Sequence, residues 1–306
     1  MAACMLCPRR CGADREAGEL GYCGQRGSVR VARAALHFFE EPPISGVRGS
    51  GTVFFTGCSL RCVFCQNRDI SRGADMGREL TPAALAEVFL SLQDKGAHNI
   101  NLVTPTHVSD RVAEVLMLCR DRLKIPVVYN SSGYERVESL RRLEGLVDIY
   151  LPDFKYMSSS LSARYSAAPD YAQVATEAVR EMYRQVGGVV FGVDKESGCE
   201  LLLRGLVVRH LVLPGCRKDS MDVLTHLASV LPREEVLFSI MSQYTPEFAD
   251  DCEDANLRRR LTRFEYESVT DRASELGLRG FTQARGSADM SFTPDFNVFS
   301  EDEEKN

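Results

Sequence analysis

The sequence predicts an α/β protein built on a parallel sheet and preceded by a small cysteine-rich lobe. From residue 52 onward, short apolar and β-branched runs alternate with amphipathic segments. This alternation favours parallel strands joined by right-handed helical crossovers. Seven of the eleven cysteines fall within the first 65 residues, in two tight groups. Turn formers separate the cysteines of the first group, so we expect no regular helix or strand there.

Composition limits the class of protein. A chain of 306 residues with 44% apolar and 26% charged residues can bury a sizeable core in one or two domains. The net charge of −6 disfavours a nucleic-acid partner. No apolar run approaches the length of a membrane span, and no apolar targeting segment precedes the cysteines. We therefore expect a cytoplasmic protein, with no membrane partner, whose reduced thiols bind metal.

The first cysteine group has the spacing C-x2-C-x3-C-x11-C and consists of Cys4, Cys7, Cys11 and Cys23. Four thiolates are enough to close a tetrahedral site. Because this segment buries little apolar surface, a metal would supply its folding energy. Zinc and an auxiliary iron–sulfur cluster both suit thiolates, and ordinary reduced thiols are the third interpretation. We expect the lobe and its linker to occupy residues 1–50, with the linker along the outside or the mouth of the main domain.

The second group follows the first expected strand of the main domain, residues 52–56. Cys58, Cys62 and Cys65 have the spacing C-x3-C-x2-C. An ordinary four-iron cluster takes one thiolate for each iron, so three thiolates leave one iron open to a ligand from outside. A zinc knuckle that borrows a fourth ligand from elsewhere is the alternative interpretation.

The rest of the chain repeats the strand–helix alternation. Helices are expected to begin at Thr81–Pro82, at Ser109 as N-cap, and near Glu135, Tyr171, Ser220 and Thr262. Strands are expected at residues 99–103, 127–130, 147–153, 207–213 and 236–240, with a hairpin at 194–198. The main domain should span residues 51–290, and an acidic tail should follow at 291–306.

Polar side chains stand at the expected C-terminal ends of these strands, where barrel-like α/β folds bind their ligands. The candidates are Thr104, His107, Asn130, Asp153, Lys155 and Arg209. The neighbouring Thr106, Ser131 and Ser132 are read equally well as turn or cap residues. The two cations are stronger candidates, because a charged side chain beside apolar strands needs a partner.

The cysteine motif after a strand, with Phe64 just before the third cysteine, resembles the radical S-adenosylmethionine (radical SAM) superfamily. The six strand–helix units resemble its partial (β/α)6 TIM-like barrel. The resemblance implies a [4Fe-4S] cluster on Cys58, Cys62 and Cys65, with SAM on the open iron. It also implies reductive cleavage of SAM to a 5′-deoxyadenosyl radical that abstracts hydrogen from a substrate. Phe64 would then lie near the adenine.

Within that superfamily, residues 51–244 look most like the pyruvate formate-lyase activating enzymes. The segment ending Asp153-Phe154-Lys155 resembles the activase Asp-Leu-Lys, which implies that Asp153 supports a monovalent cation and Lys155 meets SAM. By the same resemblance, Asn67, Asn130 and Arg209 match positions at the SAM and cation site.

The chain departs from the activases in three places. Asn130 replaces an acidic residue of the cation site. The stretch from Thr104 to His107 replaces the Gly-Gly-Glu motif that holds the SAM amino group, and Tyr244 stands about where activases have a histidine. The four-cysteine module is also foreign to the simple activases. The pattern therefore resembles an uncharacterised, activase-like branch.

The resemblance implies an oxidoreductase that receives its electron from a donor such as flavodoxin or ferredoxin. One candidate substrate is the backbone glycine of a glycyl-radical enzyme. Another peptide or a small molecule is an alternative, and a non-enzymatic iron–sulfur or zinc redox sensor is a second. The ring of polar strand ends argues against the sensor, because a sensor needs no SAM pocket.

Overall fold

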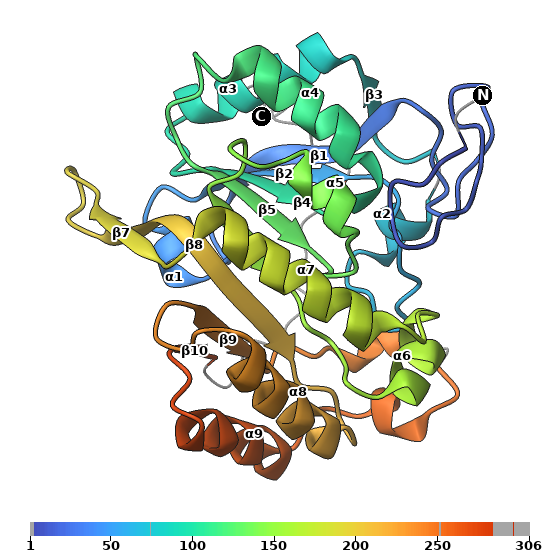
Figure 1. Cartoon of the computed structure of the whole chain (residues 1–306), viewed down its shortest axis with the longest axis vertical. Helices are drawn as coiled ribbons and strands as arrows, with labels where there is room; N and C mark the ends of the chain where they lie inside the picture. The colour runs from blue at the N-terminus through green and yellow to red at the C-terminus, as the bar shows by residue number, and fades with distance from the viewer. Residues whose placement is uncertain (1–2, 74, 251, 284–295, 297–306) are drawn as a thin grey trace.

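A single curved sheet runs through the protein, with helices on its outer face (Figure 1). The computed structural model describes residues 3–73, 75–250, 252–283 and 296. Seven neighbouring strands in this part of the chain are parallel. In sheet order they are β2 (Ser50–Phe55), β4 (Ile100–Val103), β5 (Val127–Ser131), β6 (Ile149–Pro152), β8 (Glu200–Leu211), β9 (Leu237–Met241) and β10 (Gly280–Thr282).

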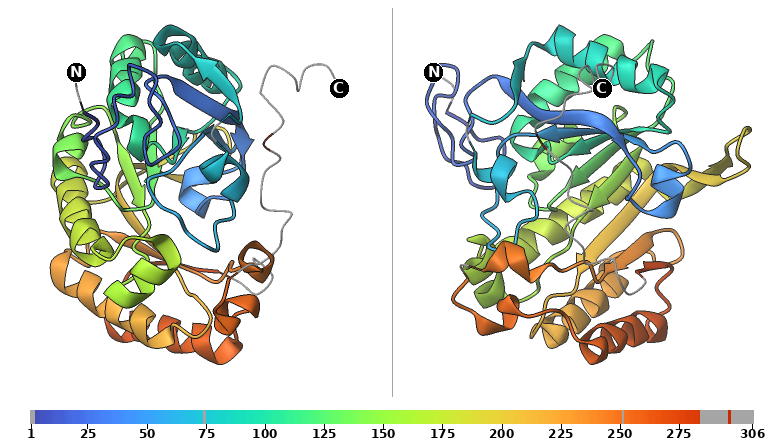
Figure 2. Two further views of the ribbon diagram at one scale, coloured as in Figure 1. Left: turned by 90° about the vertical axis from the view of Figure 1, so that its right-hand side faces the viewer. Right: turned by 180° about the vertical axis from the view of Figure 1, so that it is seen from behind.

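Antiparallel strands complete the sheet at one edge and in one hairpin. β1 (Val29–His37) pairs with β2 on one side and with β3 (Arg78–Leu80) on the other. β7 (Val190–Val193) pairs with the first half of β8, and this hairpin projects from the barrel (Figure 2).

The longer helices cover the convex side of the sheet, as both views of Figure 2 show. They are α3 (Pro82–Asp94), α4 (Ser109–Cys119), α7 (Tyr171–Val186), α8 (Arg217–Val230) and α9 (Arg263–Glu275), and the short α5 (Val137–Arg141) packs beside α7. Shorter pieces are α1 (Pro42–Ser45), α2 (Arg68–Arg72), α6 (Ser159–Ser166) and the 3₁₀ turns η1 (Thr106–Val108), η2 (Pro246–Ala249) and η3 (Ala255–Arg258). None of the described helices is both long and apolar enough to cross a membrane.

The parallel strands are covered on both faces, which explains their nearly continuous apolar sequences. Every residue of β2, β4, β5, β6 and β9 is buried. Polar residues inside these strands, such as Asn101 and Asn130, therefore need partners within the protein. Those partners lie at the site described below.

The structure confirms the α/β class, the parallel sheet and the partial barrel. Thr81 caps α3 by accepting a hydrogen bond from the Ala84 amide, and the hairpin turn lies at residues 194–198 as expected. The expected capping role of Ser109 is wrong. The turn η1 precedes α4, so Val108 takes the N-cap position and Ser109 is already helical.

Other differences concern boundaries and short elements. The strand expected at 207–213 is the second half of the longer β8, and α8 begins at Arg217 rather than Ser220. α6, β3 and β10 were not expected, because each is too short for a periodic pattern to develop. Residues 291–306 lie outside the described residues except for Phe296, whose ring meets Phe54 edge-on at 5.4 Å.

Candidate active site

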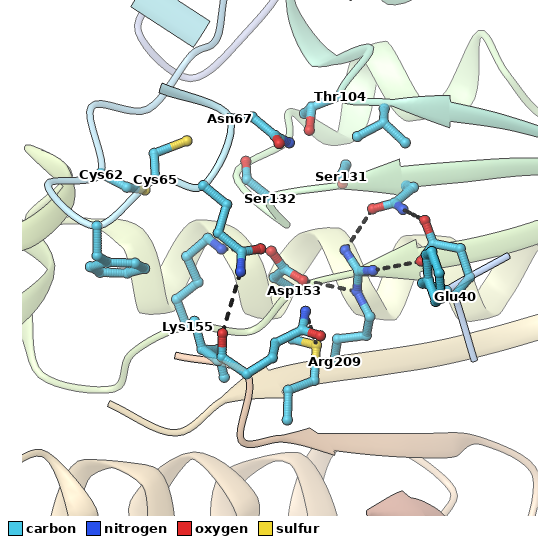
Figure 3. Close-up of a pocket in the computed structure, with 18 of the residues that line it drawn as sticks. Glu40, Cys62, Cys65, Asn67, Thr104, Ser131, Ser132, Asp153, Lys155 and Arg209 are labelled. Atoms are coloured by element: carbon cyan, nitrogen blue, oxygen red, sulfur yellow. Dashed lines mark hydrogen bonds and ion pairs between the residues drawn. The ribbon is translucent and has the colours of Figure 1, made fainter. Parts of the chain in front are cut away.

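A cavity of about 470 Å³ lies inside the barrel, at the C-terminal ends of the parallel strands (Figure 3). Its wall combines the loop that follows β2 with the ends of β4, β5, β6, β8 and β9. We call residues 57–67 the cluster loop. The cavity volume falls in the lower part of the ~300–1,000 Å³ range of small-molecule sites.

The cluster loop brings three free thiols to this cavity. Cys58, Cys62 and Cys65 all line it, and none forms a disulfide. Burial, reinforced by the two neighbouring thiols, raises the pKa of Cys58 to about 12. Burial also raises the pKa of Cys65. Such thiols become thiolates only when a strong positive charge, such as iron, is bound to them.

Two more residues of the loop face the cavity. The Phe64 ring lines it and lies 6.2 Å from the Tyr244 ring. Asn67 occupies the N-cap position of α2, but its side chain makes no capping hydrogen bond to the described residues. Asn67 lines the cavity instead (Figure 3). The loop therefore offers an aromatic face and a side-chain amide beside the thiols.

A buried ion-pair network forms the opposite wall. Asp153, just after β6, accepts hydrogen bonds from Lys155 Nζ at 2.6 Å and from Arg209 Nε at 3.0 Å. Burial alone would raise the pKa of Asp153, but the two cations hold it below its usual range. Burial opposes the charged form of Lys155, yet Asp153 raises the pKa of Lys155 above its usual range. All three side chains are therefore charged at neutral pH.

Glu40 extends this network to the floor of the barrel, and sequence reasoning did not identify it. Arg209 also donates to Glu40 Oε2 at 3.2 Å and to Asn130 Oδ1 at 2.6 Å. Glu40 Oε1 accepts from Asn101 at 2.9 Å and from Asn130 at 3.3 Å. Because β1 runs antiparallel to β2, the chain leaves it at the N-terminal ends of the parallel strands. Glu40 therefore reaches the cavity from the N-terminal ends of the strands, whereas the linker was expected along the outside or the mouth of the main domain.

Two buried hydroxyls belong to the cavity wall. Ser132 is 6% exposed and Thr245 is 3% exposed, and both line the cavity. Neither hydroxyl finds a hydrogen-bond partner within the described residues. A buried polar group left without a partner is costly, so these hydroxyls fit a site that holds a polar ligand. Thr104 lines the same cavity.

The structure does not bring His107 to the cavity. Its ring is 1% exposed, and Nε2 lies 2.7 Å from the Thr56 carbonyl oxygen. Burial lowers the pKa of His107 to about 4, so the ring is neutral. His107 follows the end of β4 by four residues, which placed it near the site in sequence, but the side chain within η1 is buried in the core.

The four cysteines of the first group lie together on the outside of the cluster loop. Cys7 and Cys23 are buried, Cys4 is partly exposed and Cys11 is exposed. As they stand, no three His, Cys, Asp or Glu side chains in the described part of the chain are arranged to hold a metal ion. For the cluster loop this is expected, because a four-iron cluster places each cysteine on a separate iron.

Comparison with known proteins identifies the class of this site. The Radical SAM superfamily profile matches residues 52–202, a stretch that includes the cluster loop, Asp153 and Lys155. The chain therefore carries a radical SAM domain and is an enzyme of SAM radical chemistry. This domain implies a [4Fe-4S] cluster and SAM as cofactors. The three cavity thiols, the cationic wall and the two unpaired hydroxyls fit both.

An uncharacterized protein of Methanocaldococcus jannaschii is 29% identical over 286 residues, covering 90% of this chain and 75% of that protein. Streptococcus suis SuiB, crystallised with its precursor peptide SuiA, shares the fold at a TM-score of 0.53. It is 12% identical over 75% of this chain, and the match spans 47% of SuiB. A domain of a pyruvate-formate lyase-activating enzyme from Bacteroides vulgatus is 13% identical, with a TM-score of 0.40 over 57% of this chain and 91% of that domain. These structural matches do not identify a subtype.

Proposed function

We propose that this enzyme cleaves SAM reductively and uses the resulting radical to abstract hydrogen from a residue-sized group, with a backbone glycine of a partner protein as the first candidate. One observation carries the proposal: three free thiols and the Lys155–Asp153–Arg209 network face each other across one cavity. When bound to Cys58, Cys62 and Cys65, the cluster supplies the electron that breaks the sulfonium bond.

The chain's own residues would bind and orient SAM. Lys155 Nζ uses one donor on Asp153 and has two left for a carboxylate. Ser132 and Thr245 offer hydroxyls that have no partner in the described residues. Thr104 lines the cavity and His107 does not, so we assign the contact with the SAM amino group to Thr104. Phe64 offers its ring face to the adenine, as the resemblance implies.

The choice of substrate rests on the resemblance to the activases and not on the size of the cavity. A backbone glycine of a partner protein is the candidate that this resemblance implies. A different peptide or a small molecule is the remaining alternative, as is a sensor that never cleaves SAM.

The test is anaerobic incubation of the reconstituted, dithionite-reduced protein with SAM, followed by chromatography for 5′-deoxyadenosine and methionine. We expect both products in equal amounts from the wild type and neither from Cys62→Ala. Cys199→Ser serves as the matched control, because Cys199 lies outside the cavity at the start of β8 and should leave the yield unchanged. A wild type that holds the cluster but releases no 5′-deoxyadenosine would refute the proposal and support the sensor.

The substrate is tested separately with deuterium. A glycine-deuterated partner protein should transfer deuterium into 5′-deoxyadenosine, which mass spectrometry detects as a shift of one mass unit. A glycyl radical in the partner would give a doublet in the electron paramagnetic resonance spectrum. Transfer from a small molecule in cell extract, with none from proteins, would reject the glycine substrate and leave SAM cleavage intact.

A further inference from the structure

The cysteine lobe, residues 3–28, has no core of its own. It contains no helix or strand among its described residues. The apolar side chains buried within this stretch are Cys7 and Cys23, which are 6% and 9% exposed. A segment of this kind cannot offset the entropy of ordering its chain by hydrophobic burial. Another source of folding free energy is required, and a metal bound to the thiols would provide it.

The four thiols are neighbours in the lobe. The Gly12 amide donates to the Cys4 carbonyl oxygen at 3.1 Å, so the turn between them brings Cys11 back beside Cys4. A Cβ placed on Gly21 would lie 3.3 Å from the Cys23 sulfur and 3.6 Å from the Cys11 sulfur, so both sulfurs lie beside Gly21. Cys7 is close enough to Cys23 and Cys4 for all three to interact electrostatically.

We favour a single ion over a cluster on chemical grounds. Four thiolates close a tetrahedral zinc site and leave no position open for a ligand, which suits a site outside the cavity. Within the described residues the thiols do not surround one point, so zinc would have to draw them together.

Arg9, which lies between Cys7 and Cys11, connects the lobe to the cluster loop by hydrogen bonds. The Arg9 guanidinium donates to the Ser59 carbonyl oxygen at 2.7 Å, next to the first cluster cysteine. It also donates to the Ser166 carbonyl oxygen at 3.2 Å, and it stacks on the Tyr22 ring at 4.3 Å. The Ser166 hydroxyl lies 3.0 Å from the Cys62 sulfur. The Arg9 side chain therefore contacts both the residue after Cys58 and the residue whose hydroxyl lies beside Cys62.

Two further contacts hold the loop from the same side. Arg61, between the first two cluster cysteines, donates to the Tyr22 carbonyl oxygen at 2.8 Å and lies over its ring at 4.8 Å. Gly57 packs so tightly on the lobe that an added Cβ would lie 2.8 Å from the Cys23 carbonyl oxygen. The lobe and the cluster loop therefore form one contact surface, visible as the dark blue segment beside α2 in Figure 1.

We propose that Cys4, Cys7, Cys11 and Cys23 bind one zinc ion, and that this structural site positions the cluster loop through Arg9. Zinc folds the lobe, the folded lobe holds Arg9 and Tyr22 in place, and these residues fix the loop that carries Cys58 and Cys62. The inference rests on the proposed cluster, but it concerns the retention of that cluster and not SAM chemistry.

The experiment measures zinc, iron and sulfide per chain in the full-length reconstituted protein, and then the rate at which a ferrous chelator removes iron. We expect one zinc in the wild type and less than a tenth of that in Cys11→Ser, whose thiol is exposed. Cys11→Ser should also lose iron about tenfold faster, the change expected from losing hydrogen bonds to a charged group. Arg9→Gln should keep its zinc and lose iron about tenfold faster. Arg10→Gln, an exposed neighbour, should match the wild type in both.

The zinc site and its coupling to the cluster loop each have a result that would overturn them. Unchanged zinc in Cys11→Ser, or iron and sulfide in place of zinc, overturns the zinc site. An unchanged rate of iron loss in Arg9→Gln overturns the coupling. If Arg9→Gln fails to fold by circular dichroism, Tyr22→Leu provides the same test from the other side of the contact. A wild type with zinc but no cluster would refute the proposed function and leave the zinc site standing.

Discussion

Asp153 forms ion pairs with two cations inside the barrel, so neutralising its carboxylate should destabilise the protein measurably. Lys155 and Arg209 lie on either side of its carboxylate, at 2.6 and 3.0 Å. The three side chains are only 14–16% exposed. Asp153→Asn keeps the size of the side chain but leaves two neighbouring cations without their shared anion. The free energy of unfolding should therefore fall.

The expected magnitude follows from burial. Removing one partner of a buried ion pair costs about 3–5 kcal/mol, and the residual exposure favours the lower end. With an unfolding entropy of about 2.1 cal/mol/K per residue, a chain of 306 residues should lose about 5 °C in Tm for a loss of about 3 kcal/mol. The pKa of Asp153 is held below its usual range, so its contribution is present at neutral pH. That contribution should disappear as the pH falls through the folded-state pKa.

Differential scanning calorimetry of the cofactor-free protein at pH 7.5 measures the shift. Glu87→Gln is the matched control, because the Glu87–Arg122 pair is as short, at 2.7 Å, but 63% and 60% exposed. It should leave the Tm unchanged. The double variant Asp153→Asn/Lys155→Met should recover part of the loss, because it removes one of the stranded cations. Equal Tm values for Asp153→Asn and Glu87→Gln would show that the network does not stabilise the barrel.

Two further predictions test the surroundings of the network. Burial raises the pKa of Glu135 to about 8, so folding favours the protonated form of its carboxyl group. The stability of the wild type that depends on this proton is fully present below about pH 4.5. It is lost as the pH rises through about 8. Glu135→Gln should therefore gain Tm relative to the wild type between pH 6 and 9, and parallel curves over that range would contradict the burial argument. Gly133 has φ +73°, and a Cβ there would collide with the Asp153 carbonyl oxygen, whereas Gly145 has φ +77° and nothing within 4 Å. Equilibrium dialysis measures the affinity of the cluster-loaded protein for SAM. Gly133→Ala should lose SAM binding, and Gly145→Ala should keep it. Equal affinities of the two variants would show that the turn at Gly133 does not position Asp153.

Sequence reasoning predicted the parts of this site that depend on local pattern. Apolar runs identified the strands, and the parallel arrangement then brought Asn130, Asp153, Lys155 and Arg209 to one end of the barrel. The spacing of the three cysteines placed them in one loop at the same end. These residues lie together because strand direction is the same throughout a parallel sheet, so residues far apart in sequence share an edge. Their roles in binding SAM and the cluster stay a prediction.

The residues that were missed depend on contacts that no local pattern encodes. Glu40 stands in a Glu-Glu-Pro-Pro stretch that indicates only a break in regular structure, and its partner Arg209 is 169 residues away. Thr245 follows an expected strand end but was not singled out, because an unpaired hydroxyl is recognised only once the surrounding atoms are placed. The contact from Arg9 to the cluster loop is invisible for the same reason, since it spans 50 residues.

The hydrogen bonds of Arg209 also change how the resemblance to activases should be read. Each of its three guanidinium nitrogens already has a partner: Asp153, Glu40 or Asn130. Three of the five N–H donors of Arg209 are used and two remain, as two remain on Lys155 Nζ. The three contacts nevertheless fix the guanidinium between Asp153, Glu40 and Asn130, whereas the Lys155 ammonium is held by Asp153 alone. We therefore propose that Lys155 contacts the SAM carboxylate and that Arg209 positions Asp153. Charge supports this division, because Lys155, Asp153, Arg209 and Glu40 alternate in sign, and removing Arg209 would leave Glu40 as a buried anion without its cation.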